Sequence, residues 1–141
     1  MTTKRENILA TIKTTLANTS GVGDRIYRSR VEPLSRGESP AIVIEPIKDE
    51  AEQNTSLPTL DWTLRVRVSV IEIATVPDQA ADDTVESLHS KIMSDLTVGG
   101  YAIDVRPFRT EFEFVEADQP LGIISNEYDI RYRTEVDDLT Q

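Results

Sequence analysis

The stretch Asp61–Ile73, DWTLRVRVSVIEI, decides the fold of this chain. From Trp62 to Val70, apolar side chains at even positions alternate with polar side chains at odd positions. A period of two predicts a β-strand with one buried face and one exposed face. The alternation changes at Ile71, which predicts either a bulge or a second covered surface at that point.

Other strand-like segments lie on both sides of this stretch. Residues 41–46, AIVIEP, form a short β-rich run between prolines. The acidic and polar connection over about 47–60 predicts a long mobile loop, because connections of that length in compact domains are usually functional or mobile. Three further runs, at 101–107, 110–116 and 123–134, alternate apolar and polar residues. We expect these last three strands to form a meander.

Two amphipathic helices are predicted among the strands. Thr3 and Glu6 have the spacing of a capping box, and the apolar positions that follow predict a helix to about Asn18. Pro77 opens a second helix with an apolar stripe and an acidic first half. Two helices among several strands do not give the regular alternation of a parallel sheet. We therefore expect one α+β domain over 1–141, with a mainly antiparallel sheet and both helices on one face.

The composition fits a single folded domain. The chain has 141 residues, of which 38% are hydrophobic, and this is enough for one core. It has no cysteine, which excludes a disulfide framework and thiolate metal sites. No run approaches the roughly 20 apolar residues of a membrane span, and no apolar leader follows the first residues. We expect a soluble chain.

The arginines from Arg25 to Arg36 stand out because the formal net charge is −10. That net charge opposes tight binding to nucleic acid, which depends on cations at phosphates. Arg25, Arg28, Arg30 and Arg36 also have glutamates close by in the sequence, so local pairing offsets much of their charge. The planar fork of arginine suits carboxylates across a protein interface. We expect an acidic protein partner, favouring another copy of this chain.

No group of residues predicts catalysis or metal binding. His89 is the only histidine, so a multi-histidine metal site is excluded, and the residue is interpreted as a helix-flank side chain. Glu111 and Glu113 share a strand face, but exposed alternate acids are typical of a solvated surface and not of an acid/base pair. We predict no catalytic, cofactor-binding or metal-ligating residue, and no enzymatic activity.

Two strands place alternating charges on the exposed face of the predicted sheet. These residues are Arg65 and Arg67 on one strand, and Glu127, Asp129, Arg131 and Arg133 on another. One interpretation is cross-strand ion pairs, each worth at most about 1 kcal/mol. The other is a surface that meets an identical neighbour in a ring, where charge pairing would set the register. The sequence leaves both open.

Four segments, taken in order, resemble a known family. They are YRSRVEPLSRGESPAIVIEP at 27–46, LRVRVSV at 64–70, GGYAIDVRP at 99–107 and FEFVEADQPLGIISNEYDIRYRT at 112–134. Together they resemble the tail terminator, or tail completion, proteins of tailed bacteriophages, the group that includes minor tail protein U. The likeness covers about 21–134 and lies in the order and spacing of segments, since none is a catalytic signature.

The resemblance implies a structural virion protein with an α+β fold. Such proteins are expected to form a hexameric ring that caps the head-proximal end of the tail tube, ends tube polymerisation and provides a surface for head–tail joining. The implied partners are other copies of the chain, the tail tube protein and a head-completion or connector protein. DNA would pass through the lumen without specific binding, and no membrane is involved. The expected location is the virion tail, after assembly in the cytoplasm of the bacterial host.

The candidate interface residues combine the arginine segment, the charged strands and the turn before the last strand. They are Arg28, Arg30, Arg36, Arg65, Arg67, Asp118, Gln119, Arg131 and Arg133. Two alternatives remain open. One is a monomeric bacterial adaptor or binding domain that recognises a peptide at a sheet edge. The other is a different neck component, such as a head-completion protein.

Overall fold

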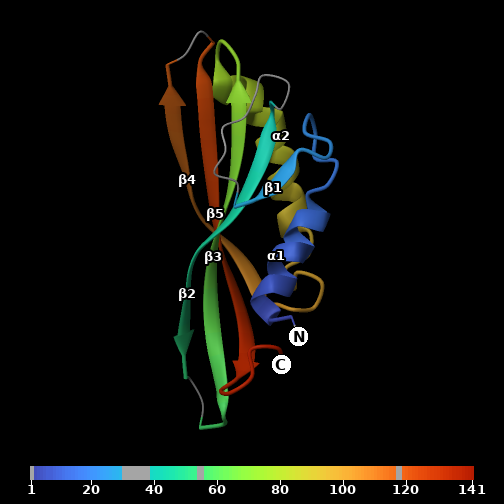
Figure 1. Ribbon diagram of the computed structural model, residues 1–141, viewed down its shortest axis with the longest axis vertical. Coiled ribbons are helices and arrows are strands. Elements are labelled where there is room, and N and C mark those ends of the chain that lie inside the picture. The colour runs from blue at the N-terminus through green and yellow to red at the C-terminus, as the bar shows by residue number, and fades with distance from the viewer. Residues whose placement is uncertain (1, 30–38, 54–55, 117–118) are drawn as a thin grey trace.

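The computed structural model describes residues 2–29, 39–53, 56–116 and 119–141. These residues form two helices and a five-stranded sheet with the strand order β1-β2-β3-β5-β4. The elements are α1 (Lys4–Thr15), β1 (Ile26–Arg28), β2 (Ala41–Glu52), β3 (Thr59–Ile73), α2 (Pro77–Met93), β4 (Asp104–Val115) and β5 (Leu121–Glu135). β1 is parallel to β2, and the other pairings are antiparallel. Both helices lie on the same side of a strongly twisted sheet, so the predicted α+β architecture is confirmed (Figure 1).

β3 and β5 form the centre of the sheet. Their register is unbroken from the Thr59–Glu135 pair to the Ile73–Leu121 pair. The predicted alternation along β3 is confirmed by four fully buried side chains on the helix side, Leu64, Val66, Val68 and Val70. Ile71 keeps its register with both neighbouring strands, so the bulge considered at this position is absent.

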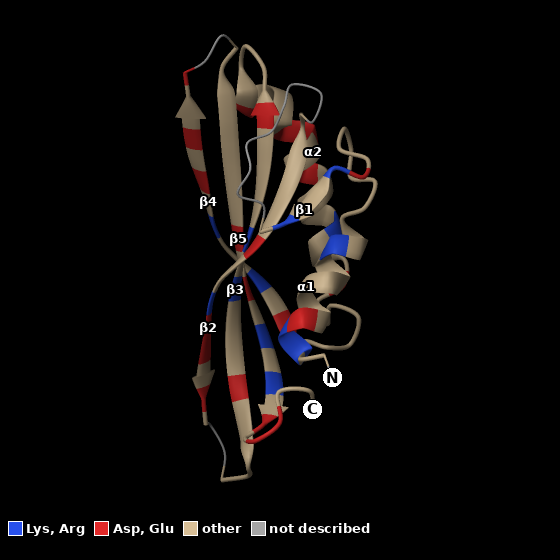
Figure 2. Cartoon of the chain, viewed as in Figure 1, with Lys and Arg blue, Asp and Glu red and all other residues tan. Residues whose placement is uncertain are grey.

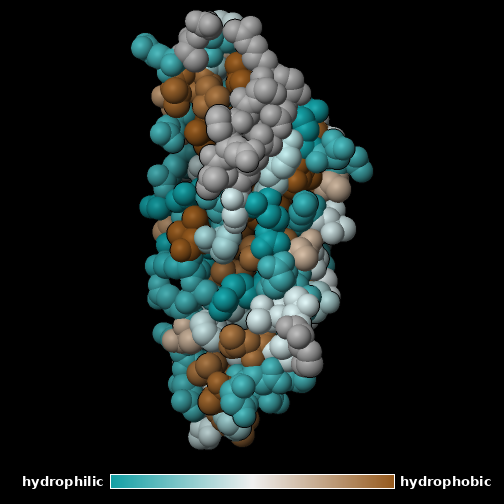
Figure 3. Space-filling view, viewed as in Figure 1, coloured by the Kyte–Doolittle hydropathy of each residue, from teal (hydrophilic) through white to brown (hydrophobic). Residues whose placement is uncertain are grey.

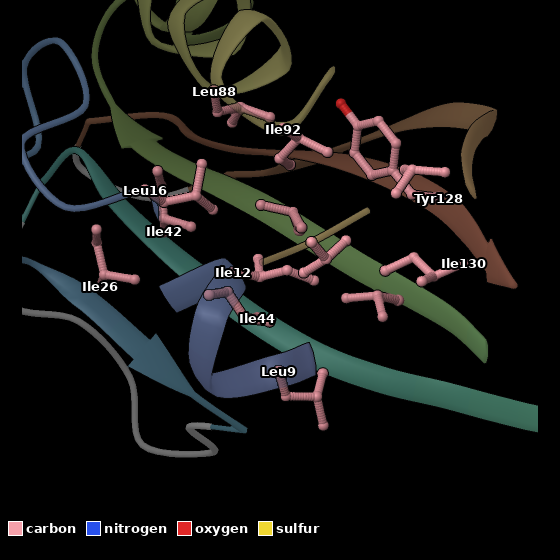
Figure 4. Close-up of a cluster of buried hydrophobic side chains, with 14 of the residues drawn as sticks. Leu9, Ile12, Leu16, Ile26, Ile42, Ile44, Leu88, Ile92, Tyr128 and Ile130 are labelled. Carbon is pink, nitrogen blue, oxygen red and sulfur yellow. The ribbon is translucent and has the colours of Figure 1, made fainter. Parts of the chain in front are cut away.

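The core lies between the helices and the helix side of the sheet. α1 contributes Ile8, Leu9 and Ile12, the residue that follows it contributes Leu16, and α2 contributes Ala81, Leu88 and Ile92. Figure 4 shows side chains of both helices and of β2 and β5 directed into this one cluster. Burial of such aliphatic side chains stabilises each by about 1.5–3 kcal/mol. The apolar stripe that was predicted on the second helix therefore packs α2 against β3 and β5.

Both predicted helix starts are confirmed. The Thr3 side chain accepts a hydrogen bond from the backbone N–H of Glu6 at 3.1 Å, which is one of the two bonds of a capping box. Pro77 is the first residue of α2, where its fixed φ favours helix initiation. α1 ends at Thr15 and not near Asn18, because Asn18 has a φ of 63° and lies in the left-handed region. Neither helix is long and apolar enough to cross a membrane, within the residues described.

The loop expected over about 47–60 is largely strand. β2 continues to Glu52 and β3 already begins at Thr59, with a register shift in β2 between Pro46 and Lys48. Because β1 pairs with β2 only as far as Ile44, the rest of β2 has no described strand on its outer side. A proline, which has no N–H to donate, is tolerated on such an edge. The prediction failed because it took Pro46 as the end of the strand.

The two strands expected at 101–107 and 110–116 are a single strand, β4. A register shift between Pro107 and Arg109 keeps the two halves in one ladder with β5. β4 pairs only with β5 among the described strands, so the last elements form a hairpin beside β3 and not a three-stranded meander. The short parallel strand β1 was not predicted. Its pairing with β2 brings Ile26 beside Ile42, and a three-residue strand has too little pattern to be recognised.

Candidate assembly surface

The face of the sheet opposite the helices carries the predicted charged side chains. We call it the open face and define it by Asp61, Arg65, Arg67, Arg109, Glu111, Glu127, Asp129, Arg131 and Arg133. Successive side chains of a strand point to opposite faces, so these residues alternate with the buried core positions. The register places Arg65 opposite Asp129 and Arg67 opposite Glu127, as the alternation in the sequence indicated.

Arg65 and Asp129 form the best-defined ion pair of the open face. Nε of Arg65 lies 2.8 Å from Oδ1 of Asp129, and Nη2 lies 3.1 Å from Oδ2. The guanidinium also lies 3.5 Å from the centre of the Phe108 ring. The hydrogen bonds to Asp129 raise the pKa of Arg65 further above its usual value. The planar fork of arginine therefore holds a carboxylate and an aromatic ring from two neighbouring strands.

Glu127 is a buried carboxylate at the middle of the open face. Its side chain is only 1% exposed, and its Oε2 lies 3.0 Å from Nε of Arg109 and 3.9 Å from Nε of Arg67. Arg109 also pairs with Glu111 at 2.7 Å. These cations offset the cost of burying the carboxylate, which is several kcal/mol when it has no partner. Oε1 of Glu127 has no hydrogen-bond partner among the described residues.

Arg109 is a member of this surface that the sequence analysis missed. Its alternation with Glu111 and Glu113 was the available signal. That signal was hidden because Pro107 was taken as the end of a strand, which left Arg109 between two expected strands. The register of β4 and β5 places Arg109 opposite Glu127.

The ends of the open face are less tightly paired. Arg133 contacts Asp61 at 2.6 Å, and this contact raises the pKa of Arg133. Arg131 is half-buried and makes no ion pair with the described residues. The cross-strand ion pairs expected for Arg65 and Arg67 are thus present within one chain, whereas Arg133 pairs with Asp61, which was not in the predicted set. Contact of the same face with another copy stays a prediction.

The arginine segment has a partner that the sequence did not suggest. Arg28 forms two hydrogen bonds with Glu6 of α1, with N–O distances of 2.8 and 3.1 Å. These bonds lower the pKa of the Glu6 carboxyl. Arg25 donates to the backbone oxygens of Pro40 and Gly21, at 2.9 and 2.8 Å. Arg25 and Arg28 therefore tie β1 to neighbouring segments of the same chain.

The remaining candidate residues are only partly described. Arg30, Arg36 and Asp118 lie outside the described residues, and Gln119 is exposed just before β5. His89 lies on the exposed flank of α2, where its Nδ1 is 2.9 Å from the hydroxyl of Tyr128. Within the described part of the chain, no cluster of three or more histidine, aspartate or glutamate side chains is placed to hold a metal ion.

The comparisons with known proteins give a likeness in structure only. No family model matches the sequence, and no curated protein matches it. Among solved structures, 36 chains match. One is a chain of the structure described as "Virion of native gene transfer agent (GTA) particle". The TM-score is 0.62 at 12% sequence identity, over 89% of this chain and 94% of that one. The likeness is one of fold.

Proposed function

We propose that this chain is a structural subunit of a phage-like particle. The observation that carries the proposal is the fold likeness to a chain of a gene transfer agent virion, which includes nearly the whole of both chains. A match over 94% of the other chain leaves little room there for an additional domain. The ordered segments that resemble tail terminator proteins support the same class of protein.

Within that class, we propose a ring of six copies at the head-proximal end of the tail tube. The ring would stop the addition of tube subunits and present a surface to head-completion proteins. The open face supports this role, because rows of fixed charges on a rigid sheet can set the register between neighbouring copies. Arg131, which makes no ion pair within the described residues, is a cation that a neighbour's carboxylate can bind.

The negative charge supports the proposed path of DNA. A formal net charge of −10 repels phosphate, so DNA would pass through the lumen of the ring without being retained. On this account, the purified ring retains no duplex DNA at moderate salt. A tight complex whose affinity falls steeply with salt would contradict it.

The position in the particle tests the proposed role directly. Electron microscopy of particles that carry a tagged chain should show the tag at one end of the tail, next to the head where a head is present. Particles assembled without the chain should have tubes of uncontrolled length. A tag distributed along the whole tube would identify the chain as a tube subunit and contradict the capping role.

A further inference from the structure

The outer edge of β4 is unpaired in the described part of the chain. β4 pairs on one side with β5, and the run Arg109–Val115 follows β5 in regular register. Soluble proteins usually protect such edges with prolines, bulges or lysines, because free N–H and C=O groups recruit other strands. Pro107 and the adjacent register shift protect only the first part of β4. The run Arg109–Val115 remains open to a further strand.

Large apolar side chains are exposed along this open run. Phe112 is 60% exposed, Phe114 is 56% exposed and Val115 is 44% exposed. The two phenylalanines lie on the helix side of the sheet, because they pair with Ile124 and Gly122 of β5. Figure 3 draws one face only, on which hydrophobic and hydrophilic surface alternate. A patch of exposed aromatic rings beside a free strand edge is typical of an interaction site.

A cavity lies next to this patch, between α2 and β4. Its volume is about 490 Å³, and its lining includes Asp82, Glu86, His89, Thr110, Asn126 and Tyr128. Thr110 shares the helix side of β4 with Phe112 and Phe114, since it pairs with Asn126. Threonine is much shorter than phenylalanine. A long side chain on a strand added beside β4 can therefore pass over Thr110 into the cavity.

The surroundings of the edge are acidic on both sides of the sheet. Asp82 and Glu86 lie in the wall of the cavity, and Glu127, with its unpartnered Oε1, also lines it. On the open face, Glu111 and Glu113 lie along β4 itself. Figure 2 shows acidic residues on α2 and on the upper part of β4. Two arginines are also close: Arg109 lines the cavity and pairs with Glu111 and Glu127, and Arg67 lies beside Glu111 and Glu113. Asp82, Glu86 and Glu113 make no ion pair with the described residues, and these three acids favour a basic occupant.

We propose that β4 receives an extended, basic segment of a partner protein as an additional strand. Backbone hydrogen bonds to Arg109–Val115 would hold the segment. On the helix side, its apolar side chains would cover Phe112 and Phe114, and a lysine or arginine would pass Thr110 into the acidic cavity. On the open face, its alternate side chains would be basic and face Glu111 and Glu113.

A synthetic peptide with this pattern provides the test. The probe contains Val-Lys-Val-Lys-Lys between neutral ends, which places two valines and one lysine on one face and two lysines on the other. Titration into the ¹⁵N-labelled full chain should shift the backbone amide signals of Arg109–Val115 and of the cavity-lining part of α2. The matched control peptide, Val-Glu-Val-Glu-Glu, should cause no such shifts.

Variants of the chain distinguish the contribution of the cavity to peptide binding from that of the strand edge. The double variant Asp82→Asn/Glu86→Gln should raise the Kd of the probe about tenfold, because it removes the charges that bind the inserted lysine. The same variant should bind a Val-Lys-Val-Lys-Val peptide as the parent chain does, since that peptide places valine at the cavity. The control variant Glu50→Gln/Glu52→Gln, on the distant β2, should leave both affinities unchanged.

Several outcomes would overturn the proposal. They are equal binding of the acidic peptide, amide shifts confined to other elements, or no binding of the basic peptide at millimolar concentration. The test is independent of the proposed ring. If the chain binds the peptide but forms no ring, only the capping role is contradicted. If the chain forms the ring but does not bind the peptide, only the docking of a basic strand is contradicted.

Discussion

Arg65 on β3 and Asp129 on β5 face each other across the open face and share two hydrogen bonds, of 2.8 and 3.1 Å. This pair lies between core positions of the same strands, because Leu64 and Val66 point to the opposite side of the sheet. A slip of one residue would turn those buried side chains to the open face. The ion pair and the core therefore specify the same register.

A double-mutant cycle measures how far the ion pair contributes. Arg65→Ala and Asp129→Ala should each lower the free energy of unfolding, with a coupling energy of about 0.5–1 kcal/mol. The exchange Arg65→Asp/Asp129→Arg should recover part of the loss. The same cycle at the more exposed Arg133–Asp61 pair should give a smaller coupling. If the losses of unfolding free energy caused by Arg65→Ala and Asp129→Ala simply add, the ion pair does not contribute to stability. Chemical denaturation provides the free energies.

The strands and helices that the sequence predicted well are those with a long regular pattern. β3 alternates over enough residues for its buried face to be identified from the pattern alone, and Pro77 with the acidic turn after it identifies the start of α2. The wrongly predicted ends of β2 and β4 occur at prolines inside strands. Pro46 and Pro107 end the local pattern, but each lies at a register shift on an edge, where a missing N–H is tolerated. Which strands form the edges is a tertiary property.

The close approach of α2 to β5 predicts intolerance of a side chain at Gly122. A Cβ at this position would lie 2.5 Å from Cβ of Pro77, and the backbone φ at Gly122 is not in the left-handed region. Gly122→Ala should therefore lower the free energy of unfolding by about 1–3 kcal/mol through overpacking. Combining it with Pro77→Gly, which removes the opposing Cβ, should show a favourable coupling. Equal losses with and without that Cβ would contradict the steric explanation.

Tyr128 predicts a loss of stability at alkaline pH. Burial raises the pKa of Tyr128 to about 12 from a usual value of 10.0. Because the folded pKa is the higher one, the stabilisation is complete below pH 10 and is lost as the pH rises toward 12. Tyr128→Phe should remove this component while it also removes the hydrogen bond to His89. Phenolate absorbance and circular dichroism, followed together, should show ionisation of Tyr128 with unfolding. Ionisation of Tyr128 in the folded chain at pH 10 would contradict this.

Variants of Arg28 and Glu6 show whether Arg28 acts within the chain, between copies, or both. Arg28→Glu should repel Glu6 and lower the thermal stability, because α1 loses its bidentate contact with β1. The exchange Glu6→Arg/Arg28→Glu should restore that contact and the stability. If Arg28 also contacts a neighbouring copy, the exchanged chain remains defective in ring formation.

The exchanged chain Glu6→Arg/Arg28→Glu also provides the outcome that would contradict a role of Arg28 between copies. Full recovery of both stability and ring formation would show that Arg28 acts only within the chain, and it would remove Arg28 from the proposed interface. Sedimentation of the parent, the single variant and the exchanged chain, at equal concentrations, distinguishes these cases. Thermal unfolding of the same samples reports on the contact within the chain.

The candidate surface was only partly predictable because its contacts depend on tertiary structure. The pairing of Arg65 with Asp129 followed from two alternating patterns in the sequence. The partner of Arg28 did not, because Glu6 approaches it only once α1 packs beside β1. The exposure of Phe112 and Phe114 was also unpredictable, since their alternation is the same as that of a buried strand face. Only the absence of a helix over the end of β4 distinguishes them, within the described residues.

The central claim is that copies of this chain act by assembling into a ring. Native mass spectrometry of the purified chain, alone and with tail tube protein added, measures the number of copies directly. We expect a species of six copies, formed by the chain alone or when the tube protein is supplied. A chain that remains a monomer at every concentration, with the tube protein present as well as absent, would contradict the account.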